Sequence, residues 1–298
     1  MSEESVHAHS LPSAAALAWV SEHASGSEIL ATEILTGGTS HSNCVIRLDQ
    51  PGERRVVLRR WVRPDWRDRD PDFTVEREVA ALILLEESGF AAPRLLAADP
   101  RGERCGVPAL LMTCLSGRPP SRRAASSPRA LEQLAATALT LHRIPGPWSG
   151  ILGYRPYNDL HDPRPPEHST RPDLWERAFT VVAGAPPVDR EVLIHRDYHP
   201  GNTLWLRGRL TGVVDWSTAS LGPAGVDLGH MRWNLVLSHG EQHASGFLRS
   251  YCASHGEEYE HHPYWDLRTL VDLLADDGLT GAALDRLEPY LARLLAHC

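Results

Sequence analysis

The stretch LIHRDYHPGNTLWLRGRLTGVVD, residues 193–215, decides how the rest of the chain is interpreted. It starts with two apolar residues, continues through a polar loop, and ends in two short apolar runs separated by a turn at 207–209. Two such runs joined by a tight turn predict a pair of antiparallel strands. Asn202 precedes the first strand and Asp215 follows the second, so both come back to the same edge. With Asp197 in the loop, three oxygen-bearing side chains are predicted to lie close together.

Oxygen ligands without thiolates suit a hard cation such as Mg2+, which usually binds one or two protein ligands together with substrate phosphates. A carboxylate beside such a site can orient an attacking hydroxyl and accept its proton. His195 and His199 lie four residues apart, the spacing of zinc ligands on a helix. Pro200-Gly201 argues against a helix there, so we interpret His195 as a structural residue that hydrogen-bonds the loop backbone and His199 as a loop-packing residue.

The pattern His-x-Asp-x-His-x-x-Asn, followed by two apolar residues and Asp-Trp, resembles the aminoglycoside phosphotransferase and choline kinase-like branch of the protein-kinase fold. The resemblance implies an α/β (α+β), bilobal protein-kinase-like fold. A small antiparallel-sheet N-lobe is expected at about 1–116 and a larger, mainly helical C-lobe at about 117–298. Asp197 is then the catalytic base, and Asn202 and Asp215 hold Mg2+. His195 and Asp227 are expected to support the catalytic loop, Asp227 through backbone amides.

The first 116 residues fit the expected nucleotide-binding lobe. Alternating and apolar runs predict strands at 28–35, 44–48, 54–62, 93–98 and 108–115, with a helix over 72–87. In the family, the Gly/Ser/Thr loop at 36–43 covers the phosphates and a Lys on the third strand holds them. The resemblance implies that ATP or GTP is bound by Ser40 in that loop, by Arg59 in place of the Lys, by its partner Glu78 and, at the adenine edge, by Met112 to Cys114.

Helices are predicted in the second part at 127–143, 172–182, 226–237, 241–254, 263–274 and 282–296. Residues 144–172 are irregular, and their Tyr and His residues either line a substrate site or decorate the surface. Only twelve positions separate Asp215 from Asp227, which leaves no room for a phosphorylation-controlled activation segment. Arg196 is therefore expected to have no phosphate-sensing role, and His142 is interpreted as a packing residue.

The composition excludes several classes of function. The chain has 298 residues and a net charge of −8, so nucleic-acid binding is disfavoured. All 30 basic residues are Arg. The five cysteines include no CxxC pair, which indicates reduced thiols. The N-terminus lacks the basic region of a signal peptide, and no apolar run reaches membrane-spanning length, so a cytoplasmic protein without a membrane partner is expected.

The expected reaction transfers the γ-phosphate of a nucleoside triphosphate to a hydroxyl group. Residues 241–298 contain ten acidic residues and four Arg, a balance of −6, which would attract a cationic acceptor such as an aminoglycoside-like antibiotic. Surface helices are often simply charged, and a cellular metabolite is the alternative acceptor: an amino alcohol, an amino acid or a sugar. Arg59 in place of Lys leaves a nucleotide-binding pseudoenzyme open. A metal-dependent hydrolase would use His195, Asp197, His199 and Asp215.

Overall fold

The computed structural model describes residues 11–35, 41–50, 54–63, 73–256, 259–275 and 279–297, and the chain divides into two compact units. Unit 1 comprises 1–116, 149–151 and 212–218. Unit 2 comprises 117–148, 152–211 and 219–298. Each unit is built around its own set of elements.

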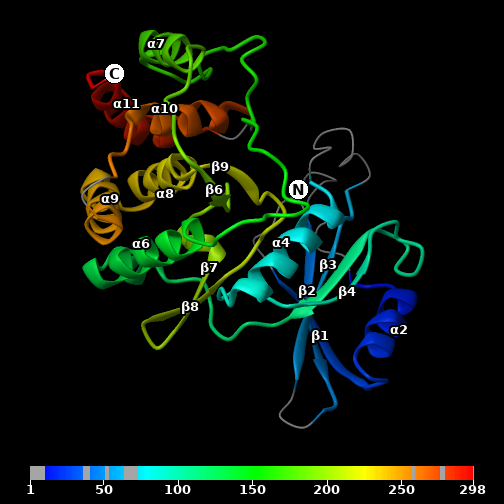
Figure 1. Cartoon of the computed structure of the whole chain (residues 1–298). Helices are drawn as coiled ribbons and strands as arrows, with labels where there is room; N and C mark the ends of the chain where they lie inside the picture. Colours follow the sequence, from blue (N-terminus) through cyan, green and yellow to red (C-terminus); the bar gives the residue numbers. More distant parts are fainter. Residues whose placement is uncertain are drawn as a thin grey trace. The chain divides into compact units, whose positions relative to one another are not determined.

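Unit 1 contains a five-stranded antiparallel sheet with the order β1-β2-β3-β5-β4 (Figure 1). Its strands are β1 (Ile29–Leu35), β2 (Ser42–Leu48), β3 (Arg55–Arg60), β4 (Leu95–Asp99) and β5 (Ala109–Thr113). The central strand β3 places Arg59 opposite Asn43 of β2 and Leu110 of β5. Because every neighbour is antiparallel, short connections suffice to join most of the strands.

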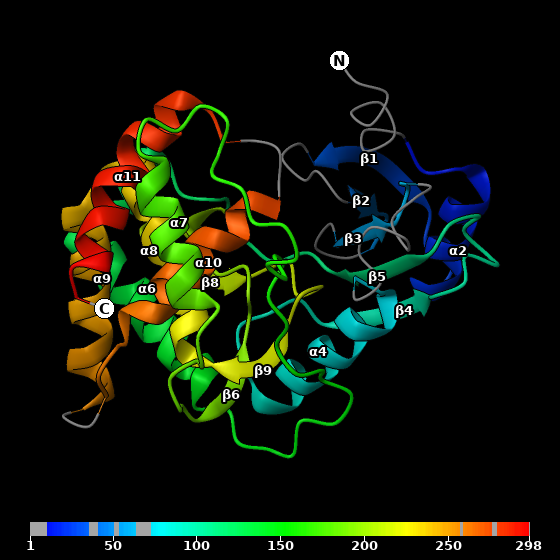
Figure 2. The same cartoon turned by 90° about the horizontal axis from the view of Figure 1, so that it is seen from above.

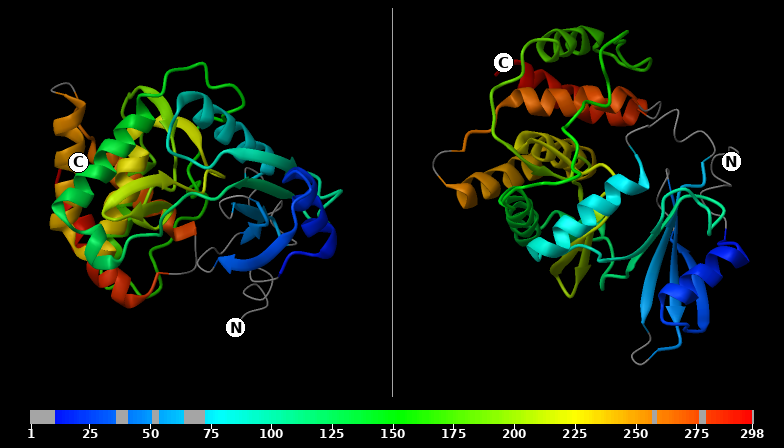
Figure 3. Two further views of the ribbon diagram at one scale, coloured as in Figure 1. Left: turned by 90° about the horizontal axis from the view of Figure 1, so that it is seen from below. Right: turned by 45° about the vertical axis from the view of Figure 1, so that its right-hand side comes forward.

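Two helices accompany this sheet. Helix α2 (Ala14–His23) is capped by the Ser13 side chain and buries Trp19 and Val20 in a core that includes Ile46 and Leu58 of the sheet. It is the blue helix beside the strands in Figure 3. Helix α4 (Val75–Ser88) begins at the cap Thr74 and ends at Gly89, whose φ of 70° is the left-handed conformation that glycine adopts without steric cost.

Unit 2 is mainly helical. Its helices are α5 (Arg122–Ala125), α6 (Pro128–His142), α7 (Pro172–Val182), α8 (Ala224–His239), α9 (Glu241–His255), α10 (Pro263–Asp272) and α11 (Gly281–Leu295), with short 3-10 turns η1 (Pro200–Asn202) and η2 (Leu273–Ala275). Helix α8 is central, because it packs against α9, α10 and α11, while α7 lies against α10 and α11 (Figure 2). Gly225 and Gly229 of α8 permit the close approach of α10, since an added Cβ at either would collide with Trp265.

Four short strands form two separate two-stranded sheets. Strand β6 (Glu191–Ile194) pairs with β9 (Ser220–Pro223) in an antiparallel ladder. Strand β7 (Thr203–Leu206) pairs with β8 (Arg209–Val213), the last two residues of which belong to unit 1. The predicted hairpin within 193–215 is therefore present.

Most elements expected from the sequence are present within a few residues of their predicted bounds. Strand β9 and helix α5 were not predicted, because four-residue elements are too short to show a periodicity. The sequence also predicts a helix over 11–23; in the structure it begins at Ala14, since Ser13 supplies the cap. No helix in the described part of the chain is long and apolar enough to cross a bilayer.

Candidate active site

The loop after β6 is fixed by one buried carboxylate. Asp227, in the first turn of α8, accepts hydrogen bonds from the backbone N–H groups of His195 (2.9 Å) and Arg196 (2.7 Å). The expected support of this loop by Asp227 through backbone amides is thus present. His195 is fully buried, and its Nδ1 accepts the N–H of Asp197 at 3.3 Å, as expected of a residue that orders the loop backbone.

His142 also contacts Asp227, which the sequence did not indicate. Its Nε2 donates to the Asp227 carboxylate at 3.0 Å, and its Nδ1 lies 2.8 Å from the hydroxyl of Tyr251. A chain of polar contacts therefore runs from α9 through α6 to the first turn of α8. The interpretation of His142 as a packing residue misses this role, which depends on three helices that are distant in sequence.

Asp197 lies in the loop with both carboxylate oxygens engaged. Oδ2 accepts the amide N–H of Asn202 at 2.9 Å, and Oδ1 lies 2.9 Å from Nε2 of His230 and 3.7 Å from Nε2 of His199. Burial alone would raise the pKa of Asp197, but hydrogen bonds and charge from the two histidines hold it well below its usual value. The carboxylate stays ionised, with 34% of its side chain exposed.

Arg196 adopts a left-handed backbone conformation, with φ of 71°. Its guanidinium lies over the ring of Tyr157, 3.8 Å from the centroid, and 5.7 Å from that of Tyr154. Such cation–π contacts are favourable by about 0.5–2 kcal/mol. Two tyrosines of the irregular segment 144–172 thus contact this arginine of the loop. In the same segment, the Asp159 carboxylate accepts the backbone N–H of His161 in a local turn.

A second cluster of charged groups belongs to unit 1 and is centred on Arg59. Its Nε donates to Asn43 at 2.9 Å, and its Nη1 contacts Glu78 at 2.9 Å and Asp215 at 2.8 Å. The expected Arg59–Glu78 ion pair is therefore present, with Arg59 5% and Glu78 1% exposed. Burial lowers the pKa of Arg59, but Asp215 and Glu78 outweigh it and raise the pKa overall; burial raises the pKa of Glu78.

Asp215 is held in a backbone conformation that non-glycine residues seldom adopt, with φ of 69°. Its Oδ1 also accepts the hydroxyl of Ser217 at 3.0 Å, and the following Trp216 is fully buried edge-on against Phe90. Two of the described non-glycine residues with positive φ lie at the charged groups: Arg196 directly precedes Asp197, and Asp215 is a member of the Arg59 cluster. Such strain persists where the surroundings over-determine it, commonly at functional sites.

His41 borders the Arg59 cluster and was not singled out in the sequence. It packs edge-on against Trp61, with ring centroids 4.5 Å apart. Burial, followed by the positive charge of Arg59, lowers the pKa of His41 to about 3. The imidazole is therefore neutral at physiological pH.

The remaining predicted nucleotide residues lie on or beside strand β5. Met112 is buried and pairs with Val57 and Leu95 in the sheet. The backbone N–H of Cys114 donates to the carbonyl oxygen of Arg55 at 3.3 Å. Ser40 lies outside the described residues.

Asn202 in unit 2 and Asp215 in unit 1 each present oxygen atoms of the kind that a hard divalent cation binds. The amide nitrogen of Asn202 is committed to Asp197, which leaves its amide oxygen as the atom able to bind a cation. The Asp215 carboxylate is about a third exposed. Carboxylate and amide oxygens suit Mg2+, which takes its other ligands from water and phosphates. In the part of the chain that the structure describes, no three His, Cys, Asp or Glu side chains gather into a metal site.

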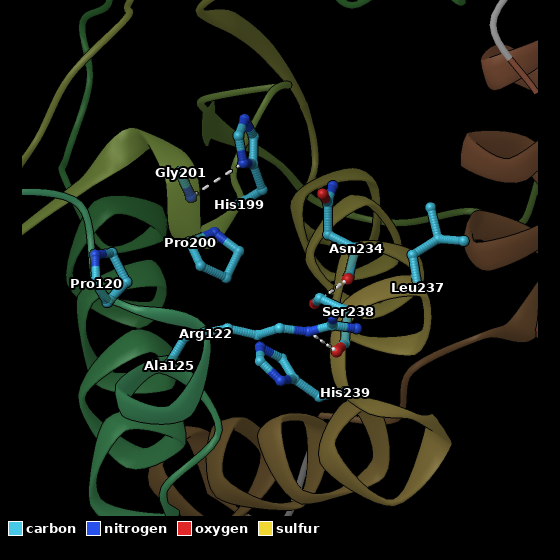
Figure 4. Close-up of a pocket in the computed structure, with 10 residues that line it drawn as sticks. All are labelled: Pro120, Arg122, Ala125, His199, Pro200, Gly201, Asn234, Leu237, Ser238 and His239. Carbon is cyan, nitrogen blue, oxygen red and sulfur yellow. Dashed lines mark hydrogen bonds between the residues drawn. The ribbon is translucent and has the colours of Figure 1, made fainter. Parts of the chain in front are cut away.

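A pocket of about 480 Å³ lies in unit 2 beside the loop (Figure 4). His199 and Gly201 line one side, and Asn234, Ser238 and His239 of α8 the other. Arg122 of α5 reaches across to donate to the carbonyl oxygen of Ser238 at 2.6 Å. No carboxylate is among the lining residues, and no described acidic group pairs with Arg122.

Four of the ten acidic residues of 241–298 are engaged inside unit 2. Asp266 accepts from His261 and Tyr290 and pairs with Arg232, and Asp272 pairs with Arg268. Glu288 is buried and accepts from Ser169, Thr170 and Trp175. Glu241 pairs with Arg293. These carboxylates stabilise helix packing and do not form an exposed acidic surface.

Comparison with known proteins identifies close similarity to one family. Residues 32–265 match the family model APH, described as the phosphotransferase enzyme family. No curated protein matches the chain. The similarity to the aminoglycoside phosphotransferase family expected from the motifs is confirmed, and so is the mixed fold with a small antiparallel sheet and a helical part.

Solved structures agree over nearly the whole chain. The apoenzyme of macrolide 2'-phosphotransferase MphH from Brachybacterium faecium superposes with a TM-score of 0.60 and 18% identity, over 94% of this chain and 96% of that one. The GDP and kanamycin complex of APH(2")-IIia gives 0.65 and 17%, over 93% and 97%. The amicoumacin kinase hAmiN, in complex with AMP-PNP, Ca2+ and its antibiotic, gives 0.59 and 14%, over 89% and 88%. At these identities the likeness establishes the fold.

Proposed function

The chain belongs to the phosphotransferase enzyme family, and on this premise we propose that it transfers the γ-phosphoryl group of ATP or GTP to a hydroxyl group of a small molecule. The observation that carries the proposal is the environment of Asp197. Asn202 donates to one oxygen of this carboxylate, and neighbouring imidazoles hold the pKa of Asp197 low. The loop therefore contains an ionised carboxylate that can accept a proton.

The role of Asp197 in this reaction is to orient the acceptor hydroxyl. Phosphoryl transfer passes through a loose transition state, so positioning and charge neutralisation contribute most of the rate. A carboxylate with a low pKa is a weak base, but the hydroxyl proton becomes acidic only as the bond to phosphorus forms. An aspartate that stays ionised and fixed in direction meets that requirement.

The nucleotide and Mg2+ are assigned to the residues predicted from the sequence. We propose that Asn202 and Asp215 bind Mg2+, which neutralises charge on the phosphates, and that Arg59, steadied by Glu78, binds phosphate oxygens. Ser40 would contact the phosphates and the backbone around Met112 and Cys114 the adenine. A bidentate guanidinium can bind phosphate in place of the Lys of the family.

The first candidate acceptor is an aminoglycoside-like antibiotic, which would make the protein a cytoplasmic resistance enzyme. It is supported by solved structures of similar fold, which include a kanamycin complex and an amicoumacin kinase. We place the acceptor beside the loop, with its reacting hydroxyl at Asp197 and the rest of the molecule toward the pocket lined by His199 and Arg122.

A second candidate, a cellular metabolite, is favoured by the charge of that pocket. Its lining includes Arg122 and two imidazoles but no carboxylate, which disfavours a polycation and suits a neutral or anionic group. An amino acid or a sugar meets this condition better than an aminoglycoside.

The test is nucleotide consumption, measured with Mg–ATP and Mg–GTP across a panel of aminoglycosides, a macrolide, choline, homoserine and common sugars. We expect turnover with one acceptor class and none in Asp197→Ala, which should bind nucleotide as the wild type does. Substituting Arg122→Glu should raise KM for an anionic acceptor and lower it for a cationic one. Nucleotide binding without transfer to any acceptor would contradict the proposal, and so would turnover without nucleotide.

A further inference from the structure

His230, on helix α8, contacts Oδ1 of Asp197. Its Nε2 lies 2.9 Å from that oxygen, and its side chain is 13% exposed. The ring packs edge-on against Trp233 of the same helix, with centroids 4.7 Å apart and planes at 62°. A half-buried imidazole supported in this way has a fixed direction, so the contact with Asp197 is part of the folded structure.

The other neighbours of the carboxylate come from the loop itself. His199 also faces the carboxylate, with its Nε2 3.7 Å from the same oxygen, and its Nδ1 accepts the N–H of Gly201. Asn202 binds the opposite oxygen, Oδ2. His230 and Asn202 therefore hold the two oxygens from different elements, and together they fix the rotation of the carboxylate about its Cβ–Cγ bond.

The helix that carries His230 already positions the loop. Asp227 and His230 are three residues apart on α8, a spacing that puts both side chains on the same face. Asp227 holds the backbone at His195 and Arg196, and His230 holds the side chain of the next residue. One turn of α8 thus specifies both the path of the loop and the direction of its carboxylate.

The protonation of the pair follows from its geometry. Because a carboxylate oxygen accepts hydrogen bonds, the ring atom 2.9 Å from Oδ1 is the Nε2–H of His230. His199 faces the same ring, with centroids 5.9 Å apart. On the neighbouring helix α10, Asp266 is committed to Arg232 and His261.

We propose that His230 is a positioning residue of the phosphoryl transfer: its Nε2–H donates to Oδ1 of Asp197 and directs the remaining lone pair at the acceptor hydroxyl. This inference rests on the proposed function. In the step, the acceptor oxygen bonds to the γ-phosphorus, the bond to the bridging oxygen breaks with its electron pair on the nucleoside diphosphate, and the hydroxyl proton passes to Asp197. His230 keeps its own proton throughout.

Two substitutions separate positioning from packing. His230→Gln retains an N–H donor at comparable reach, whereas His230→Leu fills similar space without one. We expect His230→Leu to lower kcat by roughly 10- to 100-fold, with KM for the nucleotide within about 2-fold, because a preorganised donor is lost from the catalytic carboxylate. His230→Gln should recover most of that loss. His243→Leu, on α9, is the matched control and should keep wild-type kcat.

Turnover is measured with the acceptor found in the panel or, without one, as nucleotide hydrolysis by water, and folding is checked by thermal unfolding. Wild-type kcat in His230→Leu, with Asp197→Ala inactive, would overturn the inference. So would a folded His230→Gln as impaired as His230→Leu.

A spectroscopic measurement needs no turnover. In 15N-resolved NMR of the full chain, His230 should carry its proton on Nε2, and the resonance should shift in Asp197→Ala. A proton confined to Nδ1, or a resonance indifferent to that substitution, would refute the contact. An Nε2–H signal in a protein that consumes no nucleotide would contradict the proposed function and leave the contact standing.

Discussion

The substitution Asp227→Asn tests how much of the folded state depends on the buried carboxylate that binds the loop backbone at His195 and Arg196. The change preserves shape and removes only charge and one acceptor atom. Asp227 is fully buried and accepts from two backbone N–H groups and from His142, at 2.7–3.0 Å. An amide has one oxygen, so its NH2 group must face at least one of these three donors.

The expected cost follows from those contacts. A hydrogen bond to a charged group contributes about 1.5–3 kcal/mol, and a buried N–H left without an acceptor costs about 1–3 kcal/mol. The free energy of unfolding should therefore fall by about 3–5 kcal/mol, a large part of the roughly 5–15 kcal/mol that stabilises a typical domain. At about 2–4 °C per kcal/mol, Tm should fall by about 10 °C.

The assay is urea unfolding followed by tryptophan fluorescence and circular dichroism, with thermal unfolding in parallel. Asp173→Asn is the matched control, because Asp173 is exposed in the first turn of α7 and should change stability by less than about 0.5 kcal/mol. If Asp227→Asn unfolds like that control, the reasoning from buried acceptors fails for this loop.

Two further predictions concern unit 1. Arg59→Met leaves Glu78 buried without its counter-charge and should destabilise the protein by about 3–5 kcal/mol, measured by urea unfolding. The double variant Arg59→Met/Glu78→Gln should recover a large part of that loss. Equal stabilities of the single and double variants would contradict the pairing. His41 binds a proton below its ordinary pKa of 6.5 in the unfolded chain but only near 3 in the folded one, so stability should fall as pH decreases between these values. At about pH 5 the loss should be about 2 kcal/mol, and His41→Gln, compared by urea unfolding at about pH 7 and pH 5, should lack that part of the decrease.

The sequence predicted the fold well because its signals are local. Alternating apolar runs specify the strands of unit 1, and the compact pattern around Asp197 and Asn202 carries the family resemblance. The family resemblance implied that Asp227 binds loop amides, and hydrogen bonds from two loop amides to Asp227 are present. Each of these signals depends on residues close in sequence or on a fixed motif.

The contacts that the sequence did not predict join residues far apart. His230 lies 33 residues after Asp197, and a single histidine on a helix carries no periodic signal. Its position three residues after Asp227 was the available clue, since both must face the loop. For the same reason, counting Asp266 and Glu288 as surface charge ignores the partners that bury them.

The Arg59 cluster also sets the charge that the proposed nucleotide and Mg2+ would meet. One guanidinium faces two carboxylates, Glu78 and Asp215, so these three groups together carry one negative charge. His41 stays neutral at physiological pH and cancels none of it. These groups of unit 1 therefore attract a cation even while Arg59 is charged. A Lys at this position, as in the family, would carry the same charge, so Arg59 leaves the electrostatic balance unchanged.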